Sequence, residues 1–325
     1  MIFSILLLLT GFVILIKGAD FLVAGSSSIA KRFNVSSLAI GLTVVAFGTS
    51  TPELIVSLLS ALEGRNDASF GNIIGSNNFN LFLILGLAGL IYPLVVQRNT
   101  IKYEVPFSLA ACALLYFLVN DTLIHGASNN VLSRIDAVVL LAVFVGFLYY
   151  ITRTMKNGAD LGDSSIKEYS LMVSLGLGLL GLVMLVGGGT LVVDNAVKIA
   201  ERYGLSEKLI GLTILAAGTS LPELATSAVA AYRKNTDIAI GNVVGSNIFN
   251  ITLILGVTGT IHPIPFNPVM NFDLYFLSIG TVVLMVFMFT INRRMLDRWE
   301  AFILLTAYVT YLAYQVLHDH PATVA

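Results

Sequence analysis

The chain has 325 residues, of which 56% are hydrophobic and only 11% are charged. A soluble globular domain carries about twice that charged fraction. The formal net charge of −1 offers no basic surface for nucleic acid, and the single cysteine excludes an intramolecular disulfide. Apolar runs of about 20 residues recur along the whole length, which is typical of a protein that crosses the lipid bilayer several times.

In chain order, these apolar runs predict ten transmembrane helices in an all-α membrane protein. They cover residues 2–30, 37–62, 68–92, 104–120, 135–152, 170–198, 209–231, 238–261, 273–291 and 300–317. The first run lacks a basic start and a small-residue cleavage site, so we interpret it as a span and not as a signal peptide.

The basic residues predict how the spans are oriented, because cytoplasmic loops are enriched in Lys and Arg. If the N-terminus lies outside, the cytoplasmic loops hold twelve of these residues and the outer loops hold five. Both termini are therefore expected on the outer side. The sequence has no transit peptide, which favours the plasma (inner) membrane of a prokaryote as the location.

A shift of 170 residues aligns the sequence with itself. Residues 41–93 match 211–263 without a gap, and 27 of these 53 pairs are identical. We therefore expect two copies of one five-span unit, residues 1–152 and 170–325, joined by a cytoplasmic linker at 153–169. Because five is odd, the second copy enters the membrane from the opposite face. Inverted repeats with interrupted helices are typical of secondary transporters whose site lies near the midplane.

One repeated motif places a helix breaker and an acid inside an apolar run. "GTSTPEL" at 48–54 returns as "GTSLPEL" at 218–224. Proline has no N–H to donate to the carbonyl four residues earlier, so Pro52 and Pro222 are expected to break their helices. A buried glutamate in a membrane is costly and indicates function. The oxygen-bearing side chains around the two breaks are Thr49, Ser50, Glu53, Thr219, Ser220 and Glu223.

The second repeated motif adds amide and hydroxyl oxygens. It reads "GNIIGSNNFN" at 71–80 and "GNVVGSNIFN" at 241–250. Its Asn, Ser and Asn side chains are four residues apart and so share one helix face. The GxxxG pairs permit a close helix approach, which would bring Ser76 and Asn80 beside Glu53. Asn72 and Asn242 are expected to bond between helices and not to bind ions.

The oxygen chemistry of these motifs indicates which ions they could bind. No histidine or cysteine falls in them, which argues against zinc, copper or iron and favours Ca²⁺ or Na⁺. Two carboxylates balance the charge of one Ca²⁺. Since two like charges repel, the same carboxylates without Ca²⁺ are expected to hold a proton or monovalent cations. Competition of Ca²⁺ with Na⁺ or H⁺ for these carboxylates would couple the two fluxes.

At these two motifs the sequence resembles the calcium/cation antiporter superfamily, and its prokaryotic sodium/calcium exchangers in particular. The resemblance extends over nearly the whole chain. It implies ten spans in inverted repeats, four ion sites at the centre, two gating helices (spans 1 and 6) that slide past the core, and exchange of Na⁺ for Ca²⁺, commonly three for one. It also implies that the ion ligands are Ala46, Thr49, Ser50, Glu53, Ser76, Asn80, Ala216, Thr219, Ser220, Glu223, Ser246 and Asn250, the alanines acting through backbone carbonyls.

Two features differ from some members of that superfamily. Some prokaryotic exchangers and the potassium-dependent animal branch have aspartate where this chain has Asn250, so the resemblance argues against potassium co-transport. The large cytoplasmic regulatory insertion of the animal proteins is absent, since the linker at 153–169 is short. We therefore expect no regulation by a Ca²⁺ sensor.

The predicted function is a Na⁺/Ca²⁺ antiporter that works by alternating access, with Ca²⁺ and Na⁺ as substrates and no cofactor. The alternative is a Ca²⁺/H⁺ antiporter that uses the same glutamates, although proton-coupled relatives vary the second motif to resemble "GNxxE". An intramembrane enzyme would need a nucleophile with a base or a metal motif, and the sequence has neither. The chain is expected to function as a monomer. Lys17 and Asp20, three residues apart, are expected to neutralise each other.

Overall fold

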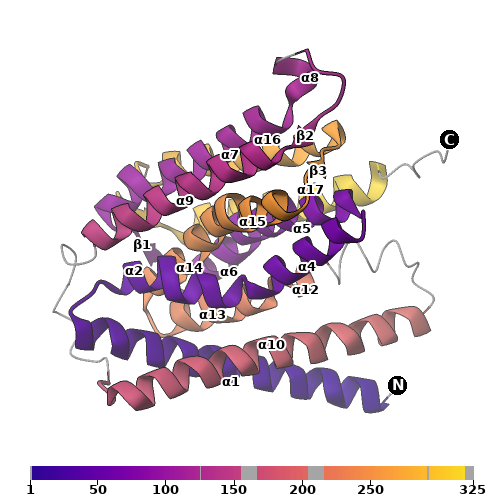
Figure 1. Cartoon of the computed structure of the whole chain (residues 1–325). Helices are drawn as coiled ribbons and strands as arrows, with labels where there is room; N and C mark the ends of the chain where they lie inside the picture. The colour runs from indigo at the N-terminus through magenta and orange to yellow at the C-terminus, as the bar shows by residue number, and fades with distance from the viewer. Residues whose placement is uncertain (1, 125, 155–166, 204–215, 291–292, 319–325) are drawn as a thin grey trace.

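The structure is a computed structural model that describes residues 2–124, 126–154, 167–203, 216–290 and 293–318. Helices make up most of this part of the chain (Figure 1). The helices of the first half are α1 (Ile2–Phe33), α2 (Ser37–Ile40), η1 (Gly41–Val45), α3 (Ala46–Thr49), α4 (Thr51–Leu62), α5 (Asn66–Asn78), η2 (Phe79–Ile84), α6 (Leu85–Ile91), η3 (Thr100–Glu104), α7 (Val105–Val119), α8 (Asp121–Ile124) and α9 (Arg134–Thr154).

The second half follows the same order of elements. Its helices are α10 (Leu171–Arg202), α12 (Ala216–Gly218), α13 (Leu221–Tyr232), α14 (Thr236–Phe249), η5 (Asn250–Ile254), α15 (Leu255–Ile261), η6 (Pro268–Met270), α16 (Asn271–Phe287) and α17 (Arg298–His318). Here η1, η2, η3 and η5 are π-helical turns, and η6 is a short 3₁₀ turn.

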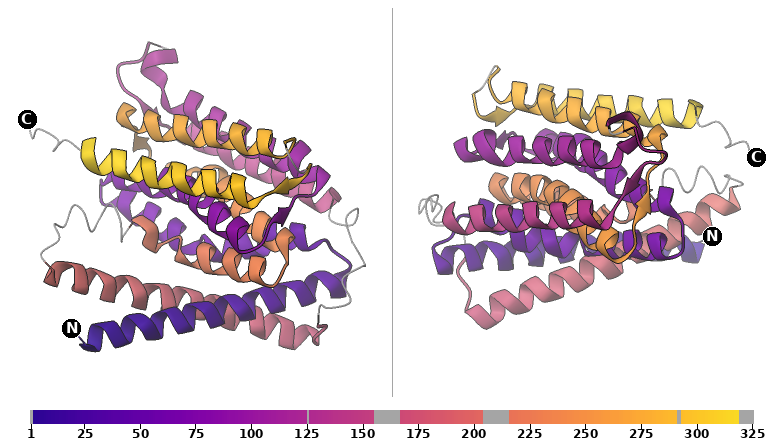
Figure 2. Two further views of the ribbon diagram at one scale, coloured as in Figure 1. Left: turned by 180° about the vertical axis from the view of Figure 1, so that it is seen from behind. Right: turned by 45° about the horizontal axis from the view of Figure 1, so that its top comes forward.

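Within the described residues, eight helices are long and apolar enough to cross a membrane. The pair Ser37–Thr49 and Thr51–Leu62 adds a ninth if it is counted as one span with a 45° bend. These nine correspond to nine of the ten predicted spans. The remaining one, 209–231, lies partly outside the described residues, so the count of ten stays a prediction. The first residues of α1 and the last turn of α17 lie at the same end of the bundle, as an even number of spans requires (Figures 1 and 2).

Helices α1 and α10 run antiparallel along one side of the bundle (Figures 1 and 2). Gly11 of α1 lies against Gly188 of α10, and Gly18 lies against Gly181. A Cβ atom added at Gly181 would be 2.6 Å from the backbone nitrogen of Leu22. The two backbones touch because these positions carry no side chain, which is how small residues permit close packing of membrane helices.

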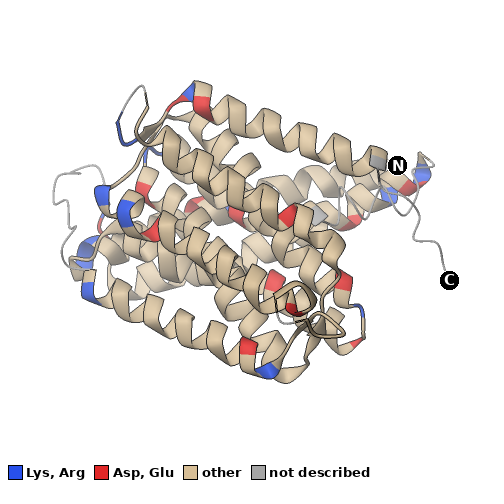
Figure 3. Cartoon of the chain, turned by 90° about the horizontal axis from the view of Figure 1, so that it is seen from above, with Lys and Arg blue, Asp and Glu red and all other residues tan. Residues whose placement is uncertain are grey.

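Two short antiparallel sheets tie loops together at opposite ends of the bundle (Figure 1). Strand β1 (Leu94–Val95) pairs with β4 (Met295–Leu296), and β2 (Val131–Leu132) pairs with β3 (Ile264–Pro265). Strands β1 and β3 occupy equivalent positions 170 residues apart, so each half contributes the same loop to a different end. Lys and Arg gather near the two ends of the bundle (Figure 3).

One expected charge pairing is wrong. The sequence predicts Lys17 as the partner of Asp20, three residues away on the same helix. The structure pairs Asp20 with Arg233 instead, whose Nε donates to Asp20 Oδ1 at 2.8 Å. Arg233 directly follows α13, so this ion pair joins α1 to the other half of the chain. Spacing along one helix gave no sign of a partner so distant in the sequence.

Candidate ion-binding site

Each "GTSxPE" motif marks a break in a helix. Helix α3 ends at Thr49 and α4 begins at Thr51, with Ser50 between them at φ −84° and ψ 6°. Pro52 is the second residue of α4, where the missing N–H is harmless because no intrahelical carbonyl would receive it. Ser220 has nearly the same backbone angles before α13. The predicted break is therefore confirmed at the first motif, but it falls two residues before the proline.

The two glutamates lie in the first turns of α4 and α13, and each is about 1% exposed. Each receives a hydrogen bond from the serine at the other break. Ser220 Oγ donates to Glu53 Oε1 at 2.9 Å, and Ser50 Oγ donates to Glu223 Oε1 at 2.9 Å. The two motifs therefore form one polar cluster, in which the partly positive helix N-termini favour the acidic side chains.

The serines of the second motif join this cluster. Ser76 Oγ lies 2.9 Å from Ser220 Oγ, and Ser246 Oγ donates to Glu223 Oε1 at 3.4 Å. Both side chains are about 1% exposed or less. The serines of the second motif therefore lie beside the two breaks. A close helix approach is seen at the glycine pair of the 241–250 copy, but a Cβ added at either glycine of the pair in the 71–80 copy would meet no other described residue within 4 Å.

The threonines beside the breaks bond to the first asparagines of the second motif. Thr49 Oγ1 donates to Asn242 Oδ1 at 3.0 Å, and Thr219 Oγ1 donates to Asn72 Oδ1 at 3.1 Å. Asn72 Nδ2 in turn donates to Ser57 Oγ at 3.0 Å, and Asn242 makes the equivalent bond to Ser227. Asn72 and Asn242 bond between helices, as expected.

Asn77 and Asn247 were not among the predicted ligands, but they bond to the side-chain amides of Asn80 and Asn250 at the centre. The side chain of Asn77 donates to the carbonyl of Asn247 at 3.2 Å, and Asn247 donates back to Asn77 at 3.3 Å. Asn80 Nδ2 donates to Asn247 Oδ1, and Asn250 Nδ2 donates to Asn77 Oδ1. Identity of Asn77 and Asn247 in the two repeats was the signal that could have identified them.

Four buried oxygen atoms of this cluster have no hydrogen-bond partner among the described residues. They are Glu53 Oε2, Glu223 Oε2, Asn80 Oδ1 and Asn250 Oδ1. A buried oxygen without a partner costs about 1–3 kcal/mol, and more if it is charged. Carboxylate and amide oxygens are ligands that Ca²⁺ prefers, so these four atoms fit a bound cation. In the part of the chain that the structure describes, no three His, Cys, Asp or Glu side chains lie close enough together to hold a metal ion by themselves.

The expected ligand set also includes the backbone carbonyls of Ala46 and Ala216. Ala46 is fully buried, and its carbonyl accepts hydrogen bonds from Ser50 N at 3.0 Å and Thr49 Oγ1 at 3.3 Å. The helix therefore uses one of the two lone pairs of this oxygen. Ala216 is the first residue of α12, and its side chain lies outside the described residues.

The asparagines Asn80 and Asn250 lie in wide π-helical turns, η2 and η5. Such turns are rare and occur frequently at functional sites, because the extra residue per turn interrupts the regular hydrogen bonds. Both turns begin within the last two residues of the second motif, at Phe79 and at Asn250. The hydrophobic pattern does not predict these turns, since the apolar period of a helix barely changes over five or six residues.

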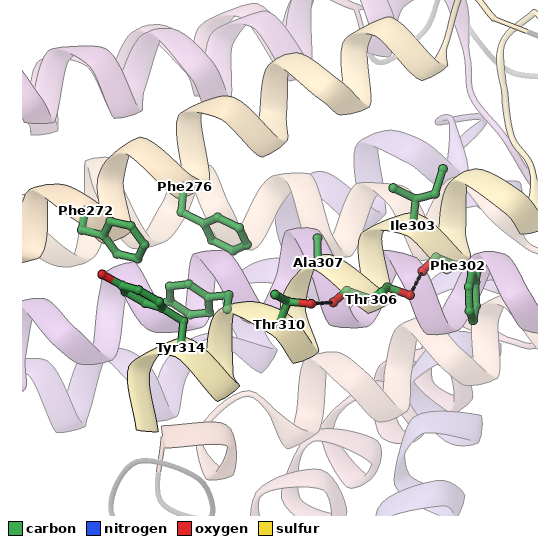
Figure 4. A pocket seen from close by; sticks show the side chains of 9 residues that line it. Phe272, Phe276, Phe302, Ile303, Thr306, Ala307, Thr310 and Tyr314 are labelled. Carbon is green, nitrogen blue, oxygen red and sulfur yellow. Dashed lines mark hydrogen bonds between the residues drawn. The ribbon is translucent and has the colours of Figure 1, made fainter. Parts of the chain in front are cut away.

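A wide groove elsewhere on the protein is unrelated to this cluster. It lies between α16 and α17 and has a volume of about 590 Å³ (Figure 4). Phe272, Phe302 and Ile303 line it and are about half exposed, so it opens on the outer surface of the bundle. Its lining is almost entirely apolar, which is unsuited to a bare cation.

A buried group of hard oxygens between interrupted membrane helices defines the class of secondary ion transporters. The comparisons with known proteins agree with this class. The chain belongs to the sodium/calcium exchanger family: the sequence profile described as "Sodium/calcium exchanger protein" matches residues 3–153 and 173–317.

Relatives and solved structures match over nearly the whole chain. The chain is 32% identical over 343 residues to the sodium/calcium exchanger MaX1 of Methanosarcina acetivorans, covering 95% of this chain and 97% of the relative. It is 36% identical over 278 residues to the inner membrane protein YrbG of Escherichia coli, covering 82% and 83%. A structure of the sodium-calcium exchanger NCX_Mj superposes with a TM-score of 0.80 at 34% identity, covering 96% of this chain and 99% of that one.

The family resemblance predicted from the two motifs is therefore confirmed. The chain is a multi-pass membrane protein of a family whose members exchange cations for Ca²⁺. The family and the structural neighbours are transporters, so the chain is a transporter and not an enzyme.

Proposed function

We propose that the chain exchanges Na⁺ for Ca²⁺ across the membrane by alternating access, with the ions bound near the midplane by Glu53 and Glu223. One observation carries this proposal. Two buried carboxylates from equivalent breaks each have one oxygen bonded to the opposite serine and one oxygen without a partner among the described residues. The names of MaX1 and NCX_Mj as sodium/calcium exchangers support the same pair of ions.

In this proposal the two carboxylates and the neutral oxygens around them have separate roles. Glu53 and Glu223 supply the two negative charges that balance one Ca²⁺. The proposed neutral ligands are the hydroxyls of Thr49, Ser50, Ser76, Thr219, Ser220 and Ser246, the amides of Asn80 and Asn250, and the carbonyls of Ala46 and Ala216. Na⁺ ions use the same carboxylates, so binding of one ion species displaces the other. Three Na⁺ for one Ca²⁺ would move one net charge in each cycle.

Alternating access follows from the proposed architecture of two inverted five-span repeats, 1–152 and 170–325, linked by 153–169. Three features support it: the antiparallel course of α1 and α10, the equivalent loops β1 and β3 at opposite ends, and the matched serine–glutamate bonds. If the repeats exchange conformations, the centre opens to the other side of the membrane. Spans 1 and 6, α1 and α10, would move past the core.

We also propose a plasma-membrane location with both termini outside and transport by single chains. The name of YrbG as an inner membrane protein supports the location. The twelve basic residues of the loops between spans 1–2, 3–4, 5–6, 7–8 and 9–10 support the orientation.

The test is uptake of radiolabelled Ca²⁺ into proteoliposomes loaded with Na⁺ and diluted into Na⁺-free buffer. Uptake by the unmodified protein is expected, as is its loss in Glu53→Gln and in Glu223→Gln. If the protein takes up Ca²⁺ only when a pH gradient replaces the Na⁺ gradient, the coupled ion is H⁺ and the Ca²⁺/H⁺ alternative is right. If neither gradient drives uptake by folded protein, the proposal is wrong.

A further inference from the structure

A further buried carboxylate, Glu104, faces a small cavity away from the centre. The cavity lies near the end of the bundle where β1 pairs with β4, and its volume is about 20 Å³. About 10–15 Å³ is enough to hold one water molecule, so the space fits a single water or a single dehydrated ion. The oxygen-bearing side chains that line it are Ser36, Gln97, Asn99, Glu104 and Thr154.

Glu104 is the charged member of this set, and it is only 2% exposed. Its Oε1 accepts a hydrogen bond from the hydroxyl of Tyr150 at 2.7 Å. Its Oε2 has no hydrogen-bond partner among the residues that the structure describes. A buried carboxylate with one free oxygen is unfavourable unless a cation or a proton accompanies it.

The neighbours of Glu104 offer further oxygen atoms to a cation. The amide nitrogen of Gln97 is used by Asp237, to whose Oδ2 it donates at 2.7 Å, which leaves the amide oxygen of Gln97 as an acceptor. Thr154 Oγ1 donates to the carbonyl of Tyr150 and keeps its lone pairs. No Lys, Arg or His is among the described residues that line the cavity.

We infer that this cavity is a binding site for one monovalent cation, Na⁺, which Glu104 Oε2 holds together with the surrounding amide and hydroxyl oxygens. One carboxylate balances one monovalent charge, whereas a divalent ion would leave an excess positive charge in a buried place. Oxygen ligands alone are suited to a hard cation. The cavity has room for one ion without its water shell.

The site is separate from the centre, and two of its residues are not repeated in the second half. At the position of Glu104 the second half has Leu274, and at the position of Asn99 it has Val269. The bound Na⁺ would connect the N-cap of α2 at Ser36 with η3 and the last turn of α9. This inference goes beyond the proposed exchange and does not depend on it.

The test is equilibrium binding of radiolabelled Na⁺ to the purified full chain in which Glu53→Gln and Glu223→Gln remove the central carboxylates. One saturable Na⁺ per chain is expected to remain. Adding Glu104→Gln should abolish it, because glutamine is nearly isosteric but lacks the charge. Absence of the remaining Na⁺, or its survival after Glu104→Gln, would overturn the inference. Neither outcome depends on whether the centre transports Ca²⁺.

Glu300→Gln is the matched control. Glu300 is also a buried carboxylate, 3% exposed, but both of its oxygens have partners, Thr290 and the backbone N–H of Asp297. It should leave the remaining Na⁺ in place. Because Glu104→Gln could misfold, the melting temperature of the Glu53→Gln/Glu223→Gln protein is measured in Na⁺ and in choline. A higher melting temperature in Na⁺ is expected, and equal values would also overturn the inference.

Discussion

The centre of the protein is built from matched halves, whereas the contacts of α1 and α10 with the core are not matched. At the centre, the bond from Ser50 to Glu223 has an equivalent 170 residues along the chain, from Ser220 to Glu53. The threonine–asparagine and asparagine–asparagine bonds are paired in the same way.

The α1 contact has no such equivalent. Asp20 of α1 forms an ion pair with Arg233, but at the equivalent position of α10 Thr190 donates to the carbonyl of Val186 in its own helix. The equivalent of Arg233 is Glu63, which pairs with Arg65.

The difference suggests a division of labour between the two regions. A centre built alike by both halves offers a bound ion the same ligands whichever side is open. An unmatched ion pair stabilises only the arrangement in which it forms, so it shifts the balance between two arrangements of α1. Substitutions at equivalent positions of the centre should therefore have equal effects on transport. At the α1 contact, a substitution in one half should have an effect that the equivalent substitution in the other half lacks.

The largest effect is expected from the two central carboxylates. Glu53→Gln and Glu223→Gln should each reduce Ca²⁺ transport by at least about a hundredfold, since removing one partner of a buried charge cluster costs about 3–5 kcal/mol. Equal losses are expected because the two sites are equivalent. Initial rates of Ca²⁺ uptake in proteoliposomes measure this. A loss in only one of the two variants would contradict the matched centre.

The next largest effect is expected from Asn77 and Asn247. Asn247→Ala removes the side-chain oxygen that accepts a hydrogen bond from Asn80, and Asn77→Ala removes the one that accepts from Asn250. Each group left unpaired costs about 1–3 kcal/mol, so both variants should lower the Ca²⁺ affinity by about tenfold or more. The measurement is the Ca²⁺ dependence of uptake. Asn78→Ala serves as the control: this neighbour bonds to the carbonyl of Asp273 and not to the central amides. An equal loss in the control would contradict the role given to the amide network.

Much of this architecture could be predicted because each motif occurs twice, at equivalent positions of the two repeats. A single proline beside a glutamate is ambiguous, but the same pair at the same offset in two copies identified the residues that the structure brings together. Asn72 and Asn242 were interpreted correctly for the same reason. The break at Ser50 was displaced from the predicted proline because a proline in the first turn of a helix is free of strain.

Two of the features that could not be predicted lack a counterpart in the other repeat. The ion pair of Asp20 with Arg233 joins residues 213 positions apart, and neither the helical spacing nor the repeat relates them. The cavity at Glu104 is of the same kind, since Leu274 replaces the acid in the second half. The π-helical turns were missed because the hydrophobic pattern does not report a single extra residue per turn.

A smaller effect is expected where the glycines of α1 and α10 bring the two helix backbones into contact. In Gly181→Ala the new Cβ would be 2.6 Å from Leu22 N and 2.7 Å from the carbonyl of Gly18, so the two helices must separate. Overpacking of this kind costs about 1–3 kcal/mol. A lower melting temperature and slower Ca²⁺ uptake are expected. Gly176→Ala is the control, because a Cβ there would meet no described residue outside its own helix backbone within 4 Å. If both variants had equal effects, the close contact between α1 and α10 would not be the cause of the lower melting temperature and slower uptake.

The smallest effect is expected from the ion pair between Asp20 and Arg233. The two side chains are 34% and 39% exposed, so the pair is worth no more than about 1 kcal/mol, a factor of about five in the balance between two states. Arg233→Gln should therefore change the rate of Ca²⁺ uptake by up to about fivefold without abolishing it. High salt should produce the same change in the unmodified protein, because it screens exposed charges.

Two further variants separate this ion pair from a general effect of charge. Asp20→Asn should reproduce the effect of Arg233→Gln, and the double variant should add nothing to it, since both changes remove one interaction. Glu63→Gln, at the equivalent position of the other repeat, should leave the rate unchanged because its partner is Arg65 on the same loop. If Glu63→Gln changed the rate as much as Arg233→Gln, the α1 contact would be as symmetric as the centre, and the division of labour between the two regions would be wrong.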